Sequence, residues 1–542
     1  MFELGDLFLL QSDAGVSVVR HRSVIPYHSH CEPLLKIVGL YQMSQMANMN
    51  IDPALLASLV ERWRPETHTF HLPVGEMTVT LQDVSCLWPL PIQGTPVTGV
   101  SDSNWSGLVD ECLGVGAASE LLKRKKRSGP DVEVVYSISG YAISLTRLRN
   151  RFAAMPNGPG EPTEDQVYQY TRAYILDMFG SMIFTDSSGD SVPAMYLQFL
   201  RYFDPNVQYN WGAAVLAVLY RNLCAAVQRK TKTIAGPMVL LQQWCWSRLP
   251  TGRPRPLNNW APRWGFPDPH SCPAFGEQWC CHKDYRQAHG RAGVSYFRGQ
   301  LQDLEDYMVE WEPYRLLLPR LPSRVHLDED VWRARMPLIH FWIVEHHYPD
   351  RVMRQFGLAQ AIPPPLPLPE YEVRRLHRVV HSLGRSNWSD EHQVYVNESY
   401  DPSRWLVVPT GVWMSEHIGP YRRWFQENCM YTVFLGAQYL QGIENPIPPP
   451  RDEVGEIGYI PSGPKHTRDV SLFNLSLFNL CDILSYMLTI LESLQGLRGL
   501  KISAWGAKLA VTKGFKNLGR CCLKLLVVLS ETMGWNLDYK TC

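Results

Sequence analysis

The sequence has no excess of charge of either sign. Its 52 Lys and Arg residues equal its 52 Asp and Glu residues over 542 positions, so the formal net charge is zero. A protein that follows a phosphate backbone over a broad surface needs a basic excess. The composition therefore argues against an extended nucleic-acid-binding surface, although it leaves room for a local basic patch.

The sequence also lacks a disulfide framework and a membrane signal. Its 13 cysteines are odd in number and include no Cys-x-x-Cys pair, which is typical of reduced, intracellular thiols. The N-terminus carries early acids and no basic segment, so it is a poor secretory signal. No clean apolar run of about 18 residues occurs, so we expect no membrane span and no membrane partner.

Motifs of several enzyme classes are absent as well. There is no Gly-x-x-x-x-Gly-Lys-Ser/Thr phosphate loop, no Gly-x-Ser-x-Gly elbow and no Gly-x-Gly-x-x-Gly fingerprint. No lysine stands in a setting that suggests a Schiff base. We therefore expect a chain without a cofactor.

Helical patterns dominate between proline-rich breaks at 156–162, 250–256, 363–369 and 445–450. Thr163 and Gln166 fit a capping box, and apolar residues follow at helical spacing. Asn210 can cap a run that is apolar nearly all round, which predicts a central helix. Further helices are expected at 238–249, from Pro337 through 348, and in three amphipathic runs from residue 470 onward. The predicted fold class is mainly α-helical, with small β-hairpins.

One stretch breaks this helical pattern. In residues 67–83 apolar and polar side chains alternate on both sides of a Pro-Val-Gly turn, which predicts a hairpin with one dry face. The residues expected on that face are Phe70, Leu72, Met77, Val79 and Leu81.

Two segments contain side chains that could bind a metal. In the predicted helix at 340–347, His340, Glu345 and His347 resemble a zinc-protease motif with a spacing that is one residue too long. Two histidines about 10 Å apart along a helix cannot chelate one ion, so solvent-facing or hydrogen-bonded histidines are favoured. The second segment, 270–289, lacks paired ligand spacing, so its weak candidates for zinc are better explained as incidental: Cys272, Cys280, Cys281, His282 and His289, beside His270.

A basic run occupies Lys123, Arg124, Lys125, Lys126 and Arg127. Five consecutive cations repel one another and stay solvated, which predicts an exposed loop. Such a cluster suits nuclear import or a contact with phosphate, and a merely soluble surface run is the plain alternative.

Several collinear segments resemble the plant mobile domain family, the aminotransferase-like plant proteins that include the MAINTENANCE OF MERISTEMS group. The resemblance covers roughly residues 30–435, and its segments are L-V-E-R-W-R-P-E-T-H-T-F-H-L-P-V-G-E-M-T-V-T-L-Q-D-V (59–84), Y-A-I-S-L-T-R-L-R-N-R-F (141–152), R-A-Y-I-L-D-M-F-G-S-M-I-F-T-D-S-S-G-D (172–190), W-G-A-A-V-L-A-V-L-Y-R-N-L-C (211–224), G-P-M-V-L-L-Q-Q-W-C-W-S-R-L-P (236–250), Y-R-L-L-L-P-R (314–320) and P-L-I-H-F-W-I-V-E-H-H-Y-P-D-R-V-M-R-Q-F-G-L (337–358).

This resemblance implies a nuclear, non-enzymatic interaction protein, similar to factors in meristem maintenance, transposon silencing and control of gene expression. It implies protein partners, among them a long-form plant serine/threonine phosphatase. The chain itself has no Gly-Asp-x-His-Gly, Gly-Asp-x-Val-Asp-Arg-Gly or Gly-Asn-His-Glu, so the metal-binding motifs of those phosphatases are missing. No catalytic residue is carried over. The domain boundaries that follow are an N-terminal segment at 1–29, the mobile domain at 30–445, a Pro/Gly-rich linker at 446–468 and a helical extension at 469–542.

Two other functions stay open at this point. One is a transposon-derived nucleic-acid-binding module that uses Lys123 to Arg127 and nearby aromatics. The other is a metal-dependent enzyme that uses His340, Glu345 and His347, or the 270–289 segment. Elemental analysis for stoichiometric zinc distinguishes the metal-dependent enzyme from the other hypotheses.

The placement of the hairpin can be tested with Leu81→Asp. If Leu81 lies on a dry face, burial contributes on the order of 1.5–3 kcal/mol, which a carboxylate would forfeit. We expect the melting temperature to fall, and an unchanged melting temperature would contradict the placement.

Overall fold

The computed structural model describes 17–18, 24–46, 49–101, 103–129, 132–155, 161–227, 233–254, 274–280, 293–316, 318–366, 375–376, 387–399, 407, 411 and 418–429, with only the backbone over 124–129 and 132–141. The linker predicted at 446–468 and the extension predicted at 469–542 lie outside these residues. Those boundaries stay predictions.

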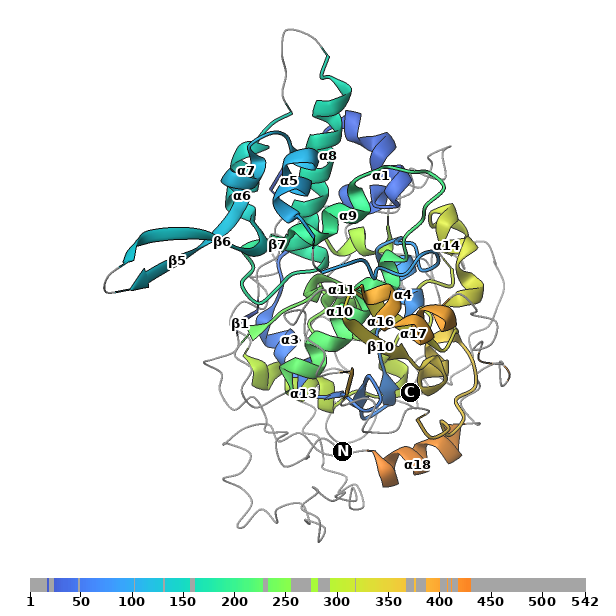
Figure 1. Cartoon of the computed structure of the whole chain (residues 1–542). Coiled ribbons are helices and arrows are strands. Elements are labelled where there is room, and N and C mark those ends of the chain that lie inside the picture. The colour runs from blue at the N-terminus through green and yellow to red at the C-terminus, as the bar shows by residue number, and fades with distance from the viewer. Residues whose placement is uncertain are drawn as a thin grey trace, which may run out of the picture. The chain divides into compact units, whose positions relative to one another are not determined.

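Helix α10 (Trp211–Ala226) lies in the middle of the described residues, as its apolar sequence predicts (Figure 1). The Asn210 side chain caps it by accepting a hydrogen bond from the Ala213 N–H at 2.9 Å. Both faces of α10 are buried, and it contacts α4 and both strands of the β9–β10 hairpin. The helix is therefore a central element of the core.

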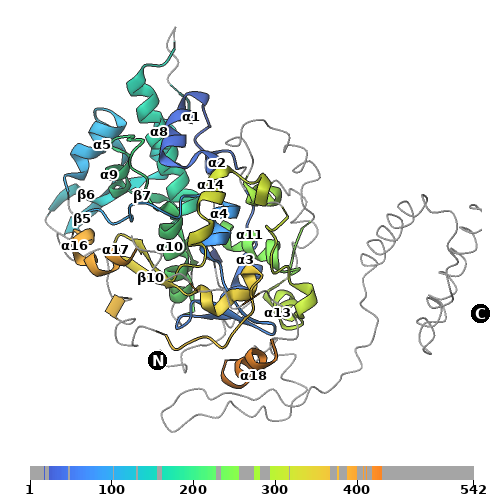
Figure 2. The same cartoon turned by 90° about the vertical axis from the view of Figure 1, so that its right-hand side faces the viewer.

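The other helices surround α10 in both views (Figure 1, Figure 2). The capping box predicted at Thr163 and Gln166 is present at the start of α8, and α8 continues into a π-helical turn at Phe179–Ile183. The remaining α-helices are α1 (Glu32–Val38), α2 (Tyr41–Ser44), α3 (Pro53–Val60), α4 (Leu81–Leu87), α5 (Trp105–Leu113), α6 (Ala117–Leu121), α7 (Leu145–Arg151), α8 (Glu164–Met178), α9 (Leu197–Leu200), α11 (Met238–Arg248), α13 (Val294–Gln302), α14 (Ser323–Leu327), α16 (Trp388–Glu391), α17 (Gln393–Ser399) and α18 (Gly419–Asn428). The mainly helical fold class is thus confirmed.

The predicted hairpin is present as β3 (Thr69–Leu72) and β4 (Gly75–Met77), with β2 (Trp63–Arg64) beside β3. Leu72 pairs with Gly75 across the turn. The second strand ends at Met77, earlier than the alternation predicts, because Thr80 begins α4 as its N-cap. Leu81 is therefore a helical residue, although it is fully buried as expected. Both faces of β4 are buried, so the prediction that only one face of the hairpin is dry was wrong.

The expected helix at 337–348 is wrong. This stretch is an antiparallel hairpin of β9 (Met336–His340) and β10 (Ile343–His347). A short apolar run fits a buried strand as well as a helix, and the β-branched residues here favour the strand. Phe341 turns the chain with φ 49°, and its N–H donates to the Val97 carbonyl at 2.6 Å. Full burial of the ring holds this left-handed conformation in place.

The basic run is a strand, where a loop was predicted. β5 (Leu122–Gly129) pairs antiparallel with β6 (Val132–Ser144), whose C-terminal end pairs with β7 (Ser191–Pro193). Sequence periodicity could not indicate this strand, since five cations show no alternation. A further parallel pair joins β1 (Ser17–Val18) to β8 (Thr233–Ile234).

Most of the buried apolar side chains belong to one continuous core. Five tryptophans lie in it fully buried, which assigns them to packing: Trp63, Trp88, Trp211, Trp244 and Trp246. Helix α18 has a small cluster of its own, formed by Ile418, Tyr421 and Phe425. It contacts the β3–β4 hairpin, where the Tyr421 hydroxyl accepts a hydrogen bond from the Glu76 N–H at 3.0 Å.

Candidate functional site

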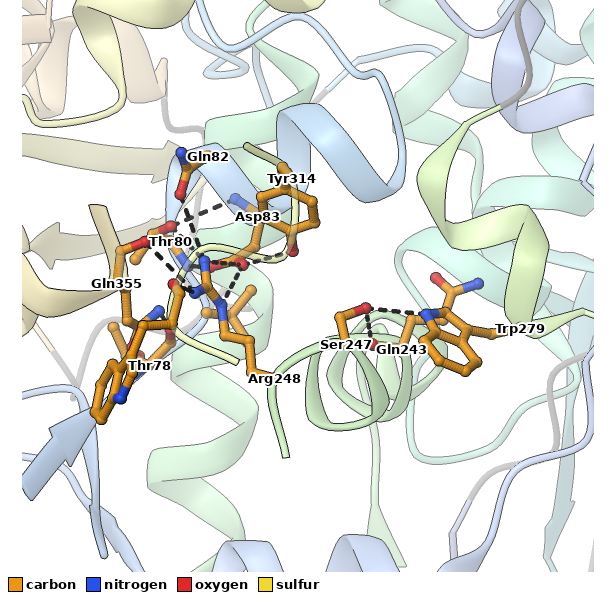
Figure 3. Close-up of polar contacts among 12 residues, drawn as sticks. Thr78, Thr80, Gln82, Asp83, Gln243, Ser247, Arg248, Trp279, Tyr314 and Gln355 are labelled. Atoms are coloured by element: carbon orange, nitrogen blue, oxygen red, sulfur yellow. Dashed lines mark hydrogen bonds and ion pairs between the residues drawn. The ribbon is translucent and has the colours of Figure 1, made fainter. Parts of the chain in front are cut away.

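Three buried carboxylates, Asp83, Glu76 and Glu345, are each paired with an arginine near the β3–β4 hairpin. We call each carboxylate and its partners a centre. The first, here the Asp83 centre, consists of Thr80, Asp83, Arg248 and Tyr314 (Figure 3). It begins as a capping box: Oδ2 of Asp83 accepts from the Thr80 N–H at 2.8 Å and from the Thr80 hydroxyl at 2.7 Å. The other carboxylate oxygen, Oδ1, is thereby left for partners outside α4.

Those partners come from two distant segments. Arg248, the last residue of α11, donates from Nε to Oδ1 of Asp83 at 2.8 Å. The Tyr314 hydroxyl donates to the same oxygen at 2.7 Å. Nη1 of Arg248 donates to the Trp311 and Gln355 carbonyls, and Nη2 donates to Oε1 of Gln82. Both ends of the ion pair are fully buried, so the pair is isolated from water.

The protonation states at this centre follow from the geometry. Burial opposes the charge on Arg248, yet the adjacent Asp83 carboxylate holds the pKa of Arg248 above its ordinary value. Burial, followed by the same carboxylate, raises the pKa of Tyr314 well above its ordinary value. Arginine and tyrosine thus both keep their protons at neutral pH. Neither is tuned as a general acid or base, which needs a pKa near the working pH.

A glutamine extends the Asp83 centre onto the hairpin. Gln355 accepts from the Thr78 N–H and donates to the Thr78 carbonyl, both at 2.8 Å (Figure 3). The side-chain amide therefore takes the place of a neighbouring strand directly after β4. Beside the centre, Trp88 and Trp279 each donate their indole N–H to α11, to Gln243 at 2.6 Å and to Ser247 at 2.9 Å.

The second centre surrounds Glu76 on β4. Its Oε1 accepts from Nε of Arg351 at 2.8 Å and from the Thr69 hydroxyl at 3.1 Å, and His71 lies 3.5 Å away. Burial works against the carboxylate, but His71 and Arg351 outweigh it and lower the pKa of Glu76. Glu76 is therefore a permanent anion that holds the hairpin to the 3-10 helix at Pro349–Phe356.

The third centre surrounds Glu345 on β10. Glu345 pairs with Arg221 of α10 and, at 3.1 Å, with Nε2 of His68, whose Nδ1 lies 3.0 Å from the His346 carbonyl oxygen. Trp63 donates to the Cys224 sulfur at 3.3 Å beside this ring. Burial disfavours the imidazolium, yet the contacts with Cys224 and Glu345 raise the pKa of His68 to about 10. Burial raises the pKa of Cys224, so that thiol stays protonated.

These findings bear on the residues singled out from the sequence. His340, Glu345 and His347 belong to a hairpin, and each has a different partner. His340 lies 2.9 Å from the Tyr196 hydroxyl, and Nδ1 of His347 lies 2.9 Å from the Ala334 carbonyl oxygen. Burial lowers the pKa of His340 to about 3 and that of His347 to about 4. In the described part of the chain, no group of three or more His, Cys, Asp or Glu could hold a metal ion.

Of the 270–289 segment, Cys280 is described. It is buried, and its thiol faces the Gly276 carbonyl oxygen at 3.7 Å and the Gln243 amide nitrogen at 3.8 Å. Cys272, Cys281, His282 and His289 lie outside the described residues, so the zinc hypothesis there stays a prediction. In the basic run, the Lys123 ammonium lies 2.5 Å from Oδ1 of Asp190, and Lys123 to Arg127 follow one another along β5.

Sequence reasoning missed the Asp83, Glu76 and Glu345 centres as units. One local signal was present, because Thr80 and Asp83 have the spacing of a capping box before an apolar run. A lone arginine at the end of an apolar tryptophan-rich helix was a second signal for a buried partner. Neither signal identifies the partner, which lies far away in sequence.

Among the helices of the described residues, none has the length and apolar character needed to cross a bilayer.

The Asp83–Arg248 pair can be tested by a double-mutant cycle. Arg248→Met should lower the free energy of unfolding by about 3–5 kcal/mol, because it leaves a buried carboxylate unpaired. Asp83→Asn combined with Arg248→Met should cost less than the sum of the single changes. Urea unfolding measures all three variants. Additive losses would contradict the coupling, and Arg201→Met, which breaks an exposed pair with Glu111, should leave the unfolding midpoint close to that of the wild type.

The charge on His68 predicts a pH dependence. Its pKa is about 10 in the folded protein and roughly 6.5 when unfolded, so the folded state binds the proton more tightly. This stabilisation is complete below about pH 6.5 and is lost as the pH rises through about 10. We expect the free energy of unfolding to fall by on the order of a few kcal/mol between about pH 7 and 10.5.

His68→Gln should flatten that decline, as measured by urea unfolding at a series of pH values. His340→Gln is the matched control, because His340 is buried but uncharged throughout this window; it should change stability without changing the slope. An identical slope for His68→Gln and the wild type would exclude this role for His68.

Comparisons with known proteins place the chain in a family. The family model described as plant mobile domain matches residues 39–426. From Arabidopsis thaliana, a serine/threonine-protein phosphatase 7 long form homolog is 38% identical over 375 residues, which cover 68% of this chain and 26% of that protein. Protein MAIN-LIKE 1 is 32% identical over 383 residues, 70% of this chain and 69% of its own length.

Protein MAINTENANCE OF MERISTEMS, also from Arabidopsis thaliana, is 32% identical over 334 residues, 62% of this chain and 63% of its own length. The match thus spans about a quarter of the phosphatase-named relative and about two thirds of the other two. No solved structure matches the chain significantly. With its family model matching most of the chain, this protein belongs to the plant mobile domain family.

Proposed function

We propose that this protein is a non-enzymatic nuclear interaction protein, a scaffold in meristem maintenance, transposon silencing and control of gene expression. One observation carries the proposal. The carboxylates of the Asp83, Glu76 and Glu345 centres are buried and paired with arginines from other segments. Their interactions hold the fold together.

A catalytic acid or base has to reach a substrate and change its protonation state near the working pH. Arg248, Tyr314 and His68 all keep their protons at neutral pH: Asp83 raises the pKa of Arg248, burial raises that of Tyr314, and contacts with Cys224 and Glu345 raise that of His68. Glu76 keeps its charge for the converse reason. These residues therefore support architecture, and the proposed activity is assigned to surfaces that contact other macromolecules.

The relatives support the biological setting. One is named for the maintenance of meristems, and another is named a phosphatase 7 long form homolog, of which this chain matches about a quarter. Because the metal-binding phosphatase motifs are missing from this sequence, we propose that the chain binds a long-form serine/threonine phosphatase as a separate partner. It would position that enzyme without hydrolysing phosphoesters itself.

The proposal is tested by affinity purification of the tagged full chain from plant nuclei. We expect recovery from the nuclear fraction together with a long-form serine/threonine phosphatase. Purified chain alone should leave p-nitrophenyl phosphate unhydrolysed with and without added Mn²⁺. Retention outside the nucleus would contradict the location, and hydrolysis that copurifies with the chain and is lost in a variant of a buried carboxylate would contradict the non-enzymatic role.

A further inference from the structure

Strands β5 and β6 form a two-stranded ribbon that leaves the body of the protein. Figure 1 shows it projecting away from helices α6 and α7. Its register begins at the base, where Leu122 pairs with Ile143, and continues to the tip, where Gly129 pairs with Val132. At about 3.3 Å per residue, the eight residues of β5 span roughly 26 Å.

The base of the ribbon is fixed to the core. Leu122 and Ile143 are buried, and β7 pairs with residues 142–144 of β6. The Arg147 guanidinium donates to the Leu122 carbonyl at 3.2 Å, and the Lys123 ammonium contacts Asp190 at 2.5 Å. The ribbon is therefore presented from a rigid support, with its outer part beyond these contacts.

In the outer part of the ribbon, β5 places basic residues on both faces, and β6 adds one acidic residue near the tip, Glu133. Successive residues of a strand alternate between faces, so Arg124 and Lys126 share one face while Lys125 and Arg127 share the other. The residues paired with these cations across the ribbon are all uncharged: Ile138, Tyr136, Ser137 and Val135. The chain as a whole has a net charge of zero, so this run is a local excess of positive charge.

We propose that the β5–β6 ribbon binds double-stranded DNA by entering the major groove. A two-stranded ribbon fits that groove, which is about 12 Å wide in B-DNA. Cations on both faces can reach the phosphates on both walls of the groove, whereas cations on one face could reach only one wall. The major groove of duplex RNA is too deep and narrow for such a ribbon, which makes duplex DNA the matching partner.

The experiment uses the purified full chain and a fluorescent 20-base-pair DNA duplex of mixed sequence, with binding followed by anisotropy between about 50 and 200 mM salt. If the four outer cations, Arg124 to Arg127, contact phosphates, the affinity should fall about 150-fold over this range, from a slope of roughly −0.9 per contact. The ribbon variant Arg124→Gln/Lys125→Gln/Lys126→Gln keeps one of the four. Its affinity should be weaker at low salt and should fall only about 3.5-fold.

A control variant removes the same amount of charge elsewhere. Arg315, Arg320 and Arg423 are exposed and lie in other elements, and their triple change to Gln should keep the steep salt dependence of the wild type. Equal melting temperatures of the two variants establish that both are folded. Duplex RNA of the same sequence should bind much more weakly.

Three results would overturn the proposal. The first is equal loss of DNA affinity in both variants, which would indicate a non-specific charge effect. The second is duplex RNA that binds as tightly as duplex DNA. The third is a wild-type protein that shows no salt-dependent binding to DNA. If the ribbon variant also fails to accumulate in the nucleus, the basic run is an import signal alone.

Discussion

The structure depends on an ion pair that has no access to water. Asp83 and Arg248 are both fully buried, and removing two charges from solvent costs several kcal/mol for each ion unless every polar atom finds a partner. The surrounding fold meets that requirement. Thr80 and Tyr314 donate hydrogen bonds to the carboxylate, and the Trp311 and Gln355 carbonyls accept hydrogen bonds from the guanidinium. These bonds fix four segments of the chain relative to one another.

The same solution recurs around the hairpin. Glu76 pairs with Arg351 and Glu345 pairs with Arg221, so each buried carboxylate takes an arginine from a distant segment. Together the three centres connect the β2–β4 sheet and the β9–β10 hairpin to α10, α11 and the 3-10 helix after β10. Small two- and three-stranded sheets are marginal on their own, and these charged links give them defined places on a helical body. The charged side chains of these three centres thereby contribute to the architecture.

Local features were predictable from the sequence, and long-range features were not. The caps at Thr163 and Asn210 depend on residues three apart, and the β3–β4 turn depends on a short motif. The Asp83–Arg248 pair joins residues 165 apart, so no spacing indicates it. The hairpin at 336–347 was mistaken for a helix because burial on both faces removes the alternation that marks a strand. Likewise, the run Lys123 to Arg127 contains no apolar residue that could reveal a period.

The contrast between the paired interior and the basic ribbon separates stability from recognition. Each buried charge contributes through partners in several segments, so changing one disturbs the whole body. The described contacts that join the ribbon to the body lie at its base, where residues 142–144 pair with β7, Arg147 donates to the Leu122 carbonyl and Lys123 contacts Asp190. A fold whose interior has little freedom to vary can therefore acquire a binding function on an element that projects from its body (Figure 1).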